Sequence, residues 1–191
     1  MASVSFPDLD RAVEEMLRVL VPCQSRDWQV RAGSLDWTCR ATAEHLAHDL
    51  LAYAGQVSAR PATAYLPLDL TVRAGATIPD VLRVVAACGG LLSSAIATAG
   101  PGARGWHWGP TDPTGFAALG MTEVLVHTYD IAQGLAEPWR PPGPLCVTVL
   151  SRLFPDAPAG DPAGVLLWCT GRAALDDRPR RTSWRMRAAL E

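Results

Sequence analysis

Apolar residues recur at helical spacing in four long segments of this chain. They fall at positions i, i+3, i+4 and i+7, the pattern of a helix that buries one face. In the second segment, for example, Leu46, Leu50 and Val57 share one side of the helix. The pattern predicts four helices, over residues 8–21, 38–58, 78–99 and 112–134.

The residues at the ends of these segments favour the same boundaries. Thr38 stands where the second helix begins, and a threonine there can cap free backbone N–H groups. The third helix begins after Thr77, with Pro79 in its first turn, where a proline loses no hydrogen bond. The fourth begins near Asp112 and ends at Gly134, which we expect to be the C′ glycine just beyond the helix.

The chain outside these helices is less regular. Residues 63–75 alternate apolar and polar positions but include Pro67, so we expect a loop or one edge strand. A proline-rich joint after residue 134 leads to two short helices, within 146–154 and 164–175, and to a possible strand over 182–190. The sequence predicts an all-α fold, a four-helix bundle (residues 1–136) with a small C-terminal α/β extension (residues 137–191).

Composition narrows the classes of function. The 191 residues are 49% hydrophobic with a net charge of −2, which is typical of a globular domain and argues against binding nucleic acid or an anionic membrane. All 17 basic residues are arginine, which excludes a lysine nucleophile. The five cysteines are scattered, the N-terminus has no signal-peptide pattern, and unbroken apolar runs are far shorter than the ~18 residues of a membrane span. We therefore expect a soluble cytoplasmic protein.

One stretch of the fourth helix, EVLVHTYD, is chemically unusual. Glu123 and His127 are four residues apart, so they lie on the same face of a helix that is apolar nearly all round. A buried carboxylate is costly unless it is paired or binds a metal. Two interpretations stay open here: half of a metal site, or a contact between two polar groups in the core.

A metal site in a bundle needs further ligands from a facing helix. The second helix contains Glu44, His45, His48 and Asp49, and spacing alone does not decide between the two histidines. Two histidines and one glutamate, with water in the fourth position, are a known catalytic zinc set.

Segments of the chain resemble a known family. LDWTCRATAEHLAHDL resembles the Trp-Thr…His signature of the DinB-like, mycothiol-dependent maleylpyruvate isomerase N-terminal family, with Trp37 eight residues before His45. MTEVLVHTYDIAQGL resembles that family's Glu-x-x-x-His-x-x-Asp helix and matches it at Glu123, His127 and Asp130. The tail LLWCTGRAALDDRPRRTSWRM resembles the C-terminal stretch of actinobacterial members.

The resemblance implies a DinB-like bundle in which His45, Glu123 and His127 hold a divalent metal. It thereby selects His45 over His48. We expect Zn²⁺, with Ni, Fe or Mn as alternatives for such ligands. The resemblance also implies that the open metal position binds a low-molecular-weight thiol, mycothiol, which then adds to an electrophilic small-molecule substrate. An arginine of the C-terminal segment lines the family's substrate site, and Arg172 matches it by position.

Three residues around this site have predicted roles of their own. Asp130 follows His127 by about one turn and either orients that histidine for catalysis or pairs with an arginine at the helix end. Arg172 either binds an anionic group of a substrate or cosubstrate or forms a salt bridge with Asp176. Trp108, in the loop before the fourth helix, is expected to wall the mouth of the cofactor pocket.

The sequence leaves several functions open. The leading expectation is a metal-dependent, mycothiol-using transferase or isomerase. Alternatives are a thiol-independent metal-dependent hydrolase, cyclase or isomerase, a non-catalytic metal-dependent binding protein, and a purely structural bundle. The region after Gly134 is shorter than the isomerase's C-terminal domain, which argues against maleylpyruvate itself as the substrate. We expect a monomer or a homodimer.

Overall fold

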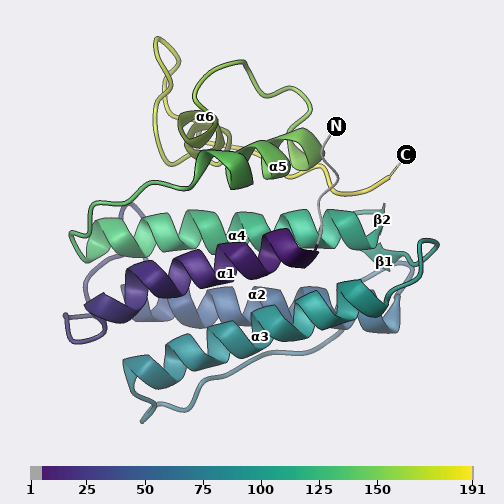
Figure 1. Ribbon diagram of the computed structural model, residues 1–191, viewed down its shortest axis with the longest axis horizontal. Coiled ribbons are helices and arrows are strands. Elements are labelled where there is room, and N and C mark those ends of the chain that lie inside the picture. The colour runs from purple at the N-terminus through teal and green to yellow at the C-terminus, as the bar shows by residue number, and fades with distance from the viewer. Residues whose placement is uncertain (1–5, 191) are drawn as a thin grey trace.

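The four long helices expected from the sequence are present and form one bundle, and their ends lie close to the expected residues. The computed structural model describes residues 6–190, so residues 1–5 and 191 of the predicted segments 1–136 and 137–191 lie outside the described residues. The division of the chain after residue 136 stays a prediction. The four long helices are α1 (Phe6–Leu20), α2 (Cys39–Ala59), α3 (Ile78–Thr98) and α4 (Pro113–Gly134), and a 3₁₀ turn, η1 (Val21–Cys23), follows α1 (Figure 1).

Side chains cap the starts of three of these helices. Thr38 accepts a hydrogen bond from the backbone N–H of Ala41, and Asp112 accepts one from Gly115 at 2.8 Å. At α3, the side chains of Thr77 and Asp80 each accept a hydrogen bond from the backbone N–H of the other residue, an arrangement called a capping box. These local bonds satisfy donors that a helix leaves free at its N-terminus, so they explain why the boundaries could be predicted.

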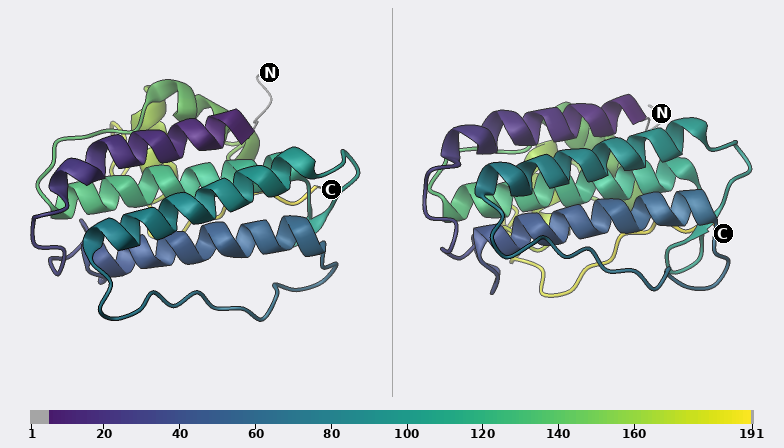
Figure 2. Two further views of the ribbon diagram at one scale, coloured as in Figure 1. Left: turned by 60° about the horizontal axis from the view of Figure 1, so that its bottom comes forward. Right: turned by 90° about the horizontal axis from the view of Figure 1, so that it is seen from below.

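α4 is the central helix of the molecule. It packs against α1, α2 and α3 in the bundle, and against α5 (Gly143–Leu153) on its other side (Figures 1 and 2). Almost every residue from 115 to 132 is buried, as an all-round apolar helix requires. The polar side chains of α4 are therefore in the interior, where they need partners.

α3 is also strongly apolar. By length and composition it could cross a membrane, with a mean hydropathy of 1.7 over its best window, although no unbroken apolar run of the sequence is that long. In the bundle 44% of that window is buried. A Cβ atom at Gly89 would lie 2.9 Å from Cγ2 of Val13, so the helix packs closely on α1, as a core helix does.

The C-terminal segment covers α4. α6 (Pro162–Cys169) packs on α5, and the chain then runs without regular structure to residue 190. The predicted strand over 182–190 is wrong, because this segment has no neighbouring strand and is held by single bonds such as Arg187 N–H to the Leu153 carbonyl at 2.9 Å. The loop interpretation of 63–75 is confirmed.

The predicted fold class is confirmed, as a mostly helical protein with a small α/β part. The two short strands, β1 (Gly105–Trp106) and β2 (Pro110–Thr111), pair antiparallel between α3 and α4 rather than in the C-terminal extension.

Gly134 does not have its predicted role. It is the last residue of α4 rather than the C′ residue, and the left-handed residue beyond the helix is Ala136, with φ of 53°. A Cβ atom at Gly134 would lie 2.6 Å from Sγ of Cys39 and closer still to the carbonyl oxygen of Arg31. Glycine is needed there because the loop before α2 approaches α4 so closely.

A pair of glycine substitutions separates this close contact from ordinary helix propensity. Gly134→Ala forces a backbone carbonyl to move, and we expect it to destabilise the protein by about 1–3 kcal/mol. Gly90→Ala, in α3, places its Cβ where no atom lies within 4 Å, so we expect it to stabilise by up to about 1 kcal/mol. Urea unfolding of both variants measures the two free energies. Equal effects would contradict this account of Gly134.

Candidate functional site

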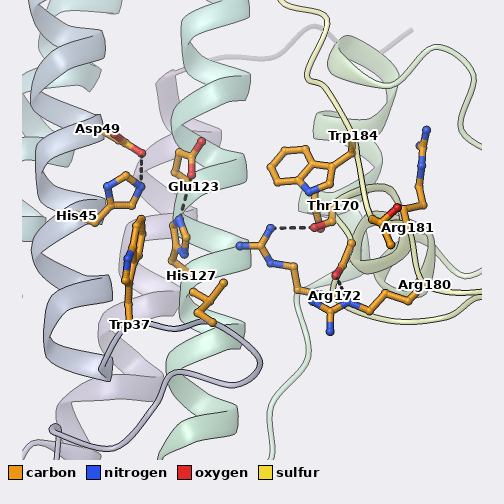
Figure 3. Close-up of a pocket in the computed structure, with 13 residues that line it drawn as sticks. Trp37, His45, Asp49, Glu123, His127, Thr170, Arg172, Arg180, Arg181 and Trp184 are labelled. Carbon is orange, nitrogen blue, oxygen red and sulfur yellow. Dashed lines mark hydrogen bonds and ion pairs between the residues drawn. The ribbon is translucent and has the colours of Figure 1, made fainter.

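A pocket of about 700 Å³ lies between the bundle and the C-terminal segment. Figure 3 shows α2 and α4 on one side and the chain around Arg172 and Trp184 on the other. The pocket therefore brings together residues that are distant in the sequence. Its lining residues include Trp37, His45, Asp49, Glu123, His127, Thr170, Arg172, Arg180, Arg181 and Trp184.

His45 and His127 face each other across the inner wall of this pocket. Their ring centroids are 5.3 Å apart, and the rings are nearly perpendicular. Each histidine bonds through Nε2 to a carboxylate four residues away on its own helix, at 3.0 Å for Asp49 and 3.2 Å for Glu123. The two helices thus present matching His–carboxylate pairs, because i and i+4 positions lie one turn apart.

A chain of buried charges continues from His127 into the C-terminal segment. Nδ1 of His127 is 3.1 Å from Oδ2 of Asp130, and Asp130 in turn accepts bonds from Nη2 and Nε of Arg172 at 2.8 and 3.3 Å. We call Glu123, His127, Asp130 and Arg172 the α4 ion network. Tyr53 of α2 donates its hydroxyl to Oε1 of Glu123 at 3.3 Å.

The charges of the α4 ion network compensate one another. Burial alone would lower the pKa of His127, but its bonds to Asp130 and Glu123 raise it to about 9. Burial opposes ionisation of Glu123 and Asp130 as well, yet the bond from His127 holds the pKa of each carboxyl below its usual range. Two carboxylates and two cations therefore share one buried row, which is how a protein interior tolerates charge.

Asp49 on α2 behaves differently. Burial raises the pKa of its carboxyl, and the nearby Glu123 charge raises it further, while the bond to His45 works in the opposite direction. Among the described residues no arginine forms an ion pair with Asp49, whereas Arg172 pairs with Asp130 on the α4 side.

The arrangement of ligands for a metal is incomplete. Within residues 6–190, no group of three or more His, Cys, Asp or Glu side chains is placed so that it could hold a metal ion. His45 and His127 each bond to a carboxylate of their own helix instead of converging on one point. The residue types on the two facing helices nevertheless suit a divalent metal. The assignment of His45, Glu123 and His127 as ligands stays a prediction.

Three other predicted residues lie as follows. His48 accepts a hydrogen bond from the Leu70 backbone and does not line the pocket. Trp108 is 64% exposed and packs beside Trp106, so it is also absent from the pocket lining. Arg172 does line the pocket, but its ion pair is with Asp130 of α4.

The sequence analysis gave no specific role to three residues in or near the pocket. Asp49 had a detectable signal, since it follows His45 at the spacing that separates Glu123 from His127. Tyr53 is not part of the pocket lining, and its hydroxyl contact with Glu123 depends on the facing helix α4, which no local pattern indicates. Trp184 belongs to an irregular segment, where no periodic pattern could indicate which way the side chain points.

One comparison with known proteins is informative. The family model described as the mycothiol maleylpyruvate isomerase N-terminal domain matches residues 9–132, well over half of the chain. The matched region contains α2 and all but the last two residues of α4, the helices that form the inner wall of the pocket, and it ends before Arg172. No curated protein and no solved structure matches the chain.

The α4 ion network gives a prediction about stability. Asp130→Asn leaves Arg172, whose side chain is 8% exposed, without its carboxylate. Removing one partner of a buried ion pair costs about 3–5 kcal/mol, and we expect a loss of that size in urea unfolding. The control is Asp36→Asn, which breaks the exposed Arg31–Asp36 pair and should change stability by less than about 1 kcal/mol. A similar small change for both would show that the network contributes little.

Proposed function

The chain belongs to the mycothiol maleylpyruvate isomerase N-terminal domain family, and from this premise we propose that it is a metal-dependent enzyme that activates a thiol. In this proposal His45, Glu123 and His127 hold a divalent metal, with Zn²⁺ expected. The thiol is mycothiol, as the family's name implies, and it adds to an electrophilic small molecule, with transfer or isomerisation as the outcome. The observation that carries the proposal is the pair of facing histidines with their carboxylates.

The distance between the histidine rings supports this ligand set. Two imidazoles that bind one tetrahedral zinc ion at about 2.0–2.1 Å have ring centroids roughly 5 Å apart, and the centroids of His45 and His127 are 5.3 Å apart. Metal binding then requires that Nε2 of each ring release its present carboxylate partner and any proton it holds. A metal in this position would bind a thiol as its thiolate, which is the nucleophilic form.

The chain's own residues have separate tasks in this proposal. Asp130 accepts from Nδ1 of His127 and so keeps Nε2 directed at Glu123 and the pocket. Arg172 holds Asp130 with two bonds. Asp130 and Arg172 therefore act through His127 as positioning residues. For Asp130 this is the orienting role expected from the sequence, whereas for Arg172 it differs from the expected binding of a ligand's anionic group. Tyr53 donates to Oε1 of Glu123, and the other oxygen of this carboxylate, Oε2, is the one that pairs with His127.

The location of the protein is part of the proposal. All five cysteines are buried free thiols. Free thiols are typical of a reducing compartment, which supports the expected cytoplasmic location, where a low-molecular-weight thiol can serve as cosubstrate.

Metal content is the first test. We expect about one metal ion per chain in untagged protein, and a loss of nearly all of it in His45→Ala and His127→Ala, because a three-ligand site cannot spare an imidazole. His48→Ala is the matched control, since His48 is three residues from His45 on the same helix but outside the pocket. Mass spectrometry of the metals gives the result. A well-folded wild-type protein without metal would rule out the proposed site.

The use of a thiol is tested separately with the cobalt-substituted protein. Mycothiol should produce a thiolate-to-cobalt absorption band, whereas S-methyl mycothiol, which cannot form a thiolate, should not. If the protein holds cobalt but mycothiol does not change its spectrum, the thiol chemistry is refuted and the proposed metal site still stands.

A further inference from the structure

The two walls of the pocket differ in charge. The inner wall has the carboxylates of Asp49 and Glu123, whereas the C-terminal segment contributes guanidinium groups (Figure 3). Arg172 is already bound in the α4 ion network. Arg180 is different, because its Nε donates to the Gly171 carbonyl and it has no carboxylate partner among the described residues. An anion is therefore attracted to the outer wall, where the Arg180 guanidinium is available to it.

The neighbouring arginine does not compete for this role. The guanidinium of Arg181 stacks on the ring of Trp168 at 4.9 Å. In Figure 3 it points away from Glu123 and His127. Arg180 is thus the cation of the outer wall that is best placed to bind a ligand's anionic group.

Two tryptophan rings face the same pocket. Trp37 lies edge-on to His45 with ring centroids 4.6 Å apart, and it remains 45% exposed. Trp184 projects from the opposite wall, beside Arg172, and remains 38% exposed. A single exposed tryptophan is ordinary, but two that line one pocket from opposite sides offer flat apolar surfaces on which a planar ring can stack.

We propose that the electrophilic substrate is an aromatic carboxylate, whose ring packs against Trp37 and Trp184 and whose carboxylate binds Arg180. That this ligand is a substrate rests on the proposed function. Its binding in the pocket needs neither metal nor thiol. The anionic end lies on the outer wall, away from the carboxylates of Asp49 and Glu123. The central part of the ligand is then beside the facing histidines.

Three small probes test separately how much the aromatic ring and the carboxylate of a ligand contribute to binding. Cinnamate has both, crotonate has the same unsaturated carboxylate without the ring, and cinnamamide has the ring without the charge. We would titrate each into the full-length, chelator-treated protein by calorimetry, so that no carboxylate can bind a metal. Cinnamate should bind about tenfold more tightly than either of the others, since a charged hydrogen bond and an aromatic contact are each worth a factor of that order.

Matched variants place the ligand in the pocket. Arg180→Gln should weaken cinnamate binding about tenfold and leave cinnamamide unchanged, and Trp184→Leu should weaken both by about threefold to tenfold. The controls are Arg178→Gln and Trp108→Leu, whose side chains do not line this pocket. Trp37→Leu is a second ring variant in case Trp184→Leu does not fold, which a melting curve shows. Equal affinity for cinnamate and crotonate, no binding of any probe, or equal effects of variants and controls would overturn the proposal.

The two proposals can fail independently. Absence of metal in the wild-type protein refutes the metal-dependent function but leaves an aromatic-carboxylate site, if cinnamate still binds as described. A metal site that takes up mycothiol, in a protein that does not prefer cinnamate, leaves the function and refutes the substrate class.

Discussion

The α4 ion network is the interaction on which the rest of this structure depends. α4 is enclosed by α1, α2, α3 and α5, so any charge on it must be compensated inside the protein. Glu123, His127 and Asp130 achieve this along one face of the helix, and Arg172 completes the balance from a segment some forty residues later in the chain. One set of contacts therefore neutralises the core, orients His127 and holds the C-terminal segment on the bundle.

This arrangement divides the pocket into two parts with different origins. The inner wall comes from α2 and α4, regular helices whose side chains are positioned by packing, and the family match covers α2 and all but the last two residues of α4. The outer wall comes from an irregular segment beyond the matched region, held by single hydrogen bonds and by arginine–tryptophan stacking. In our proposals the inner wall supplies the reactive groups and the outer wall selects the ligand, so a change of substrate would require substitutions mainly in the outer wall.

The helices were predictable because their signals are local. Thr38, Asp112 and the apolar stripes act within a few residues of their own position, so they could be identified in the sequence. The two wrong predictions depend instead on parts of the chain that are distant in the sequence. Gly134 resembled a helix terminator, but the loop before α2 requires it, and residues 182–190 resembled a strand, but no partner strand adjoins them. Each error involves a contact between segments that are far apart in the chain.

The same distinction applies to the candidate site. The sequence by itself determined that α4 is a buried helix with Glu123 and His127 on one face, because helical periodicity and the cost of buried charge are local properties. Its family resemblance pointed to His45. Only the tertiary structure decided that His45 faces His127, that Arg172 binds Asp130, and that Trp184 lies opposite Trp37. These pairs depend on how separate elements pack, and no spacing along the chain encodes that.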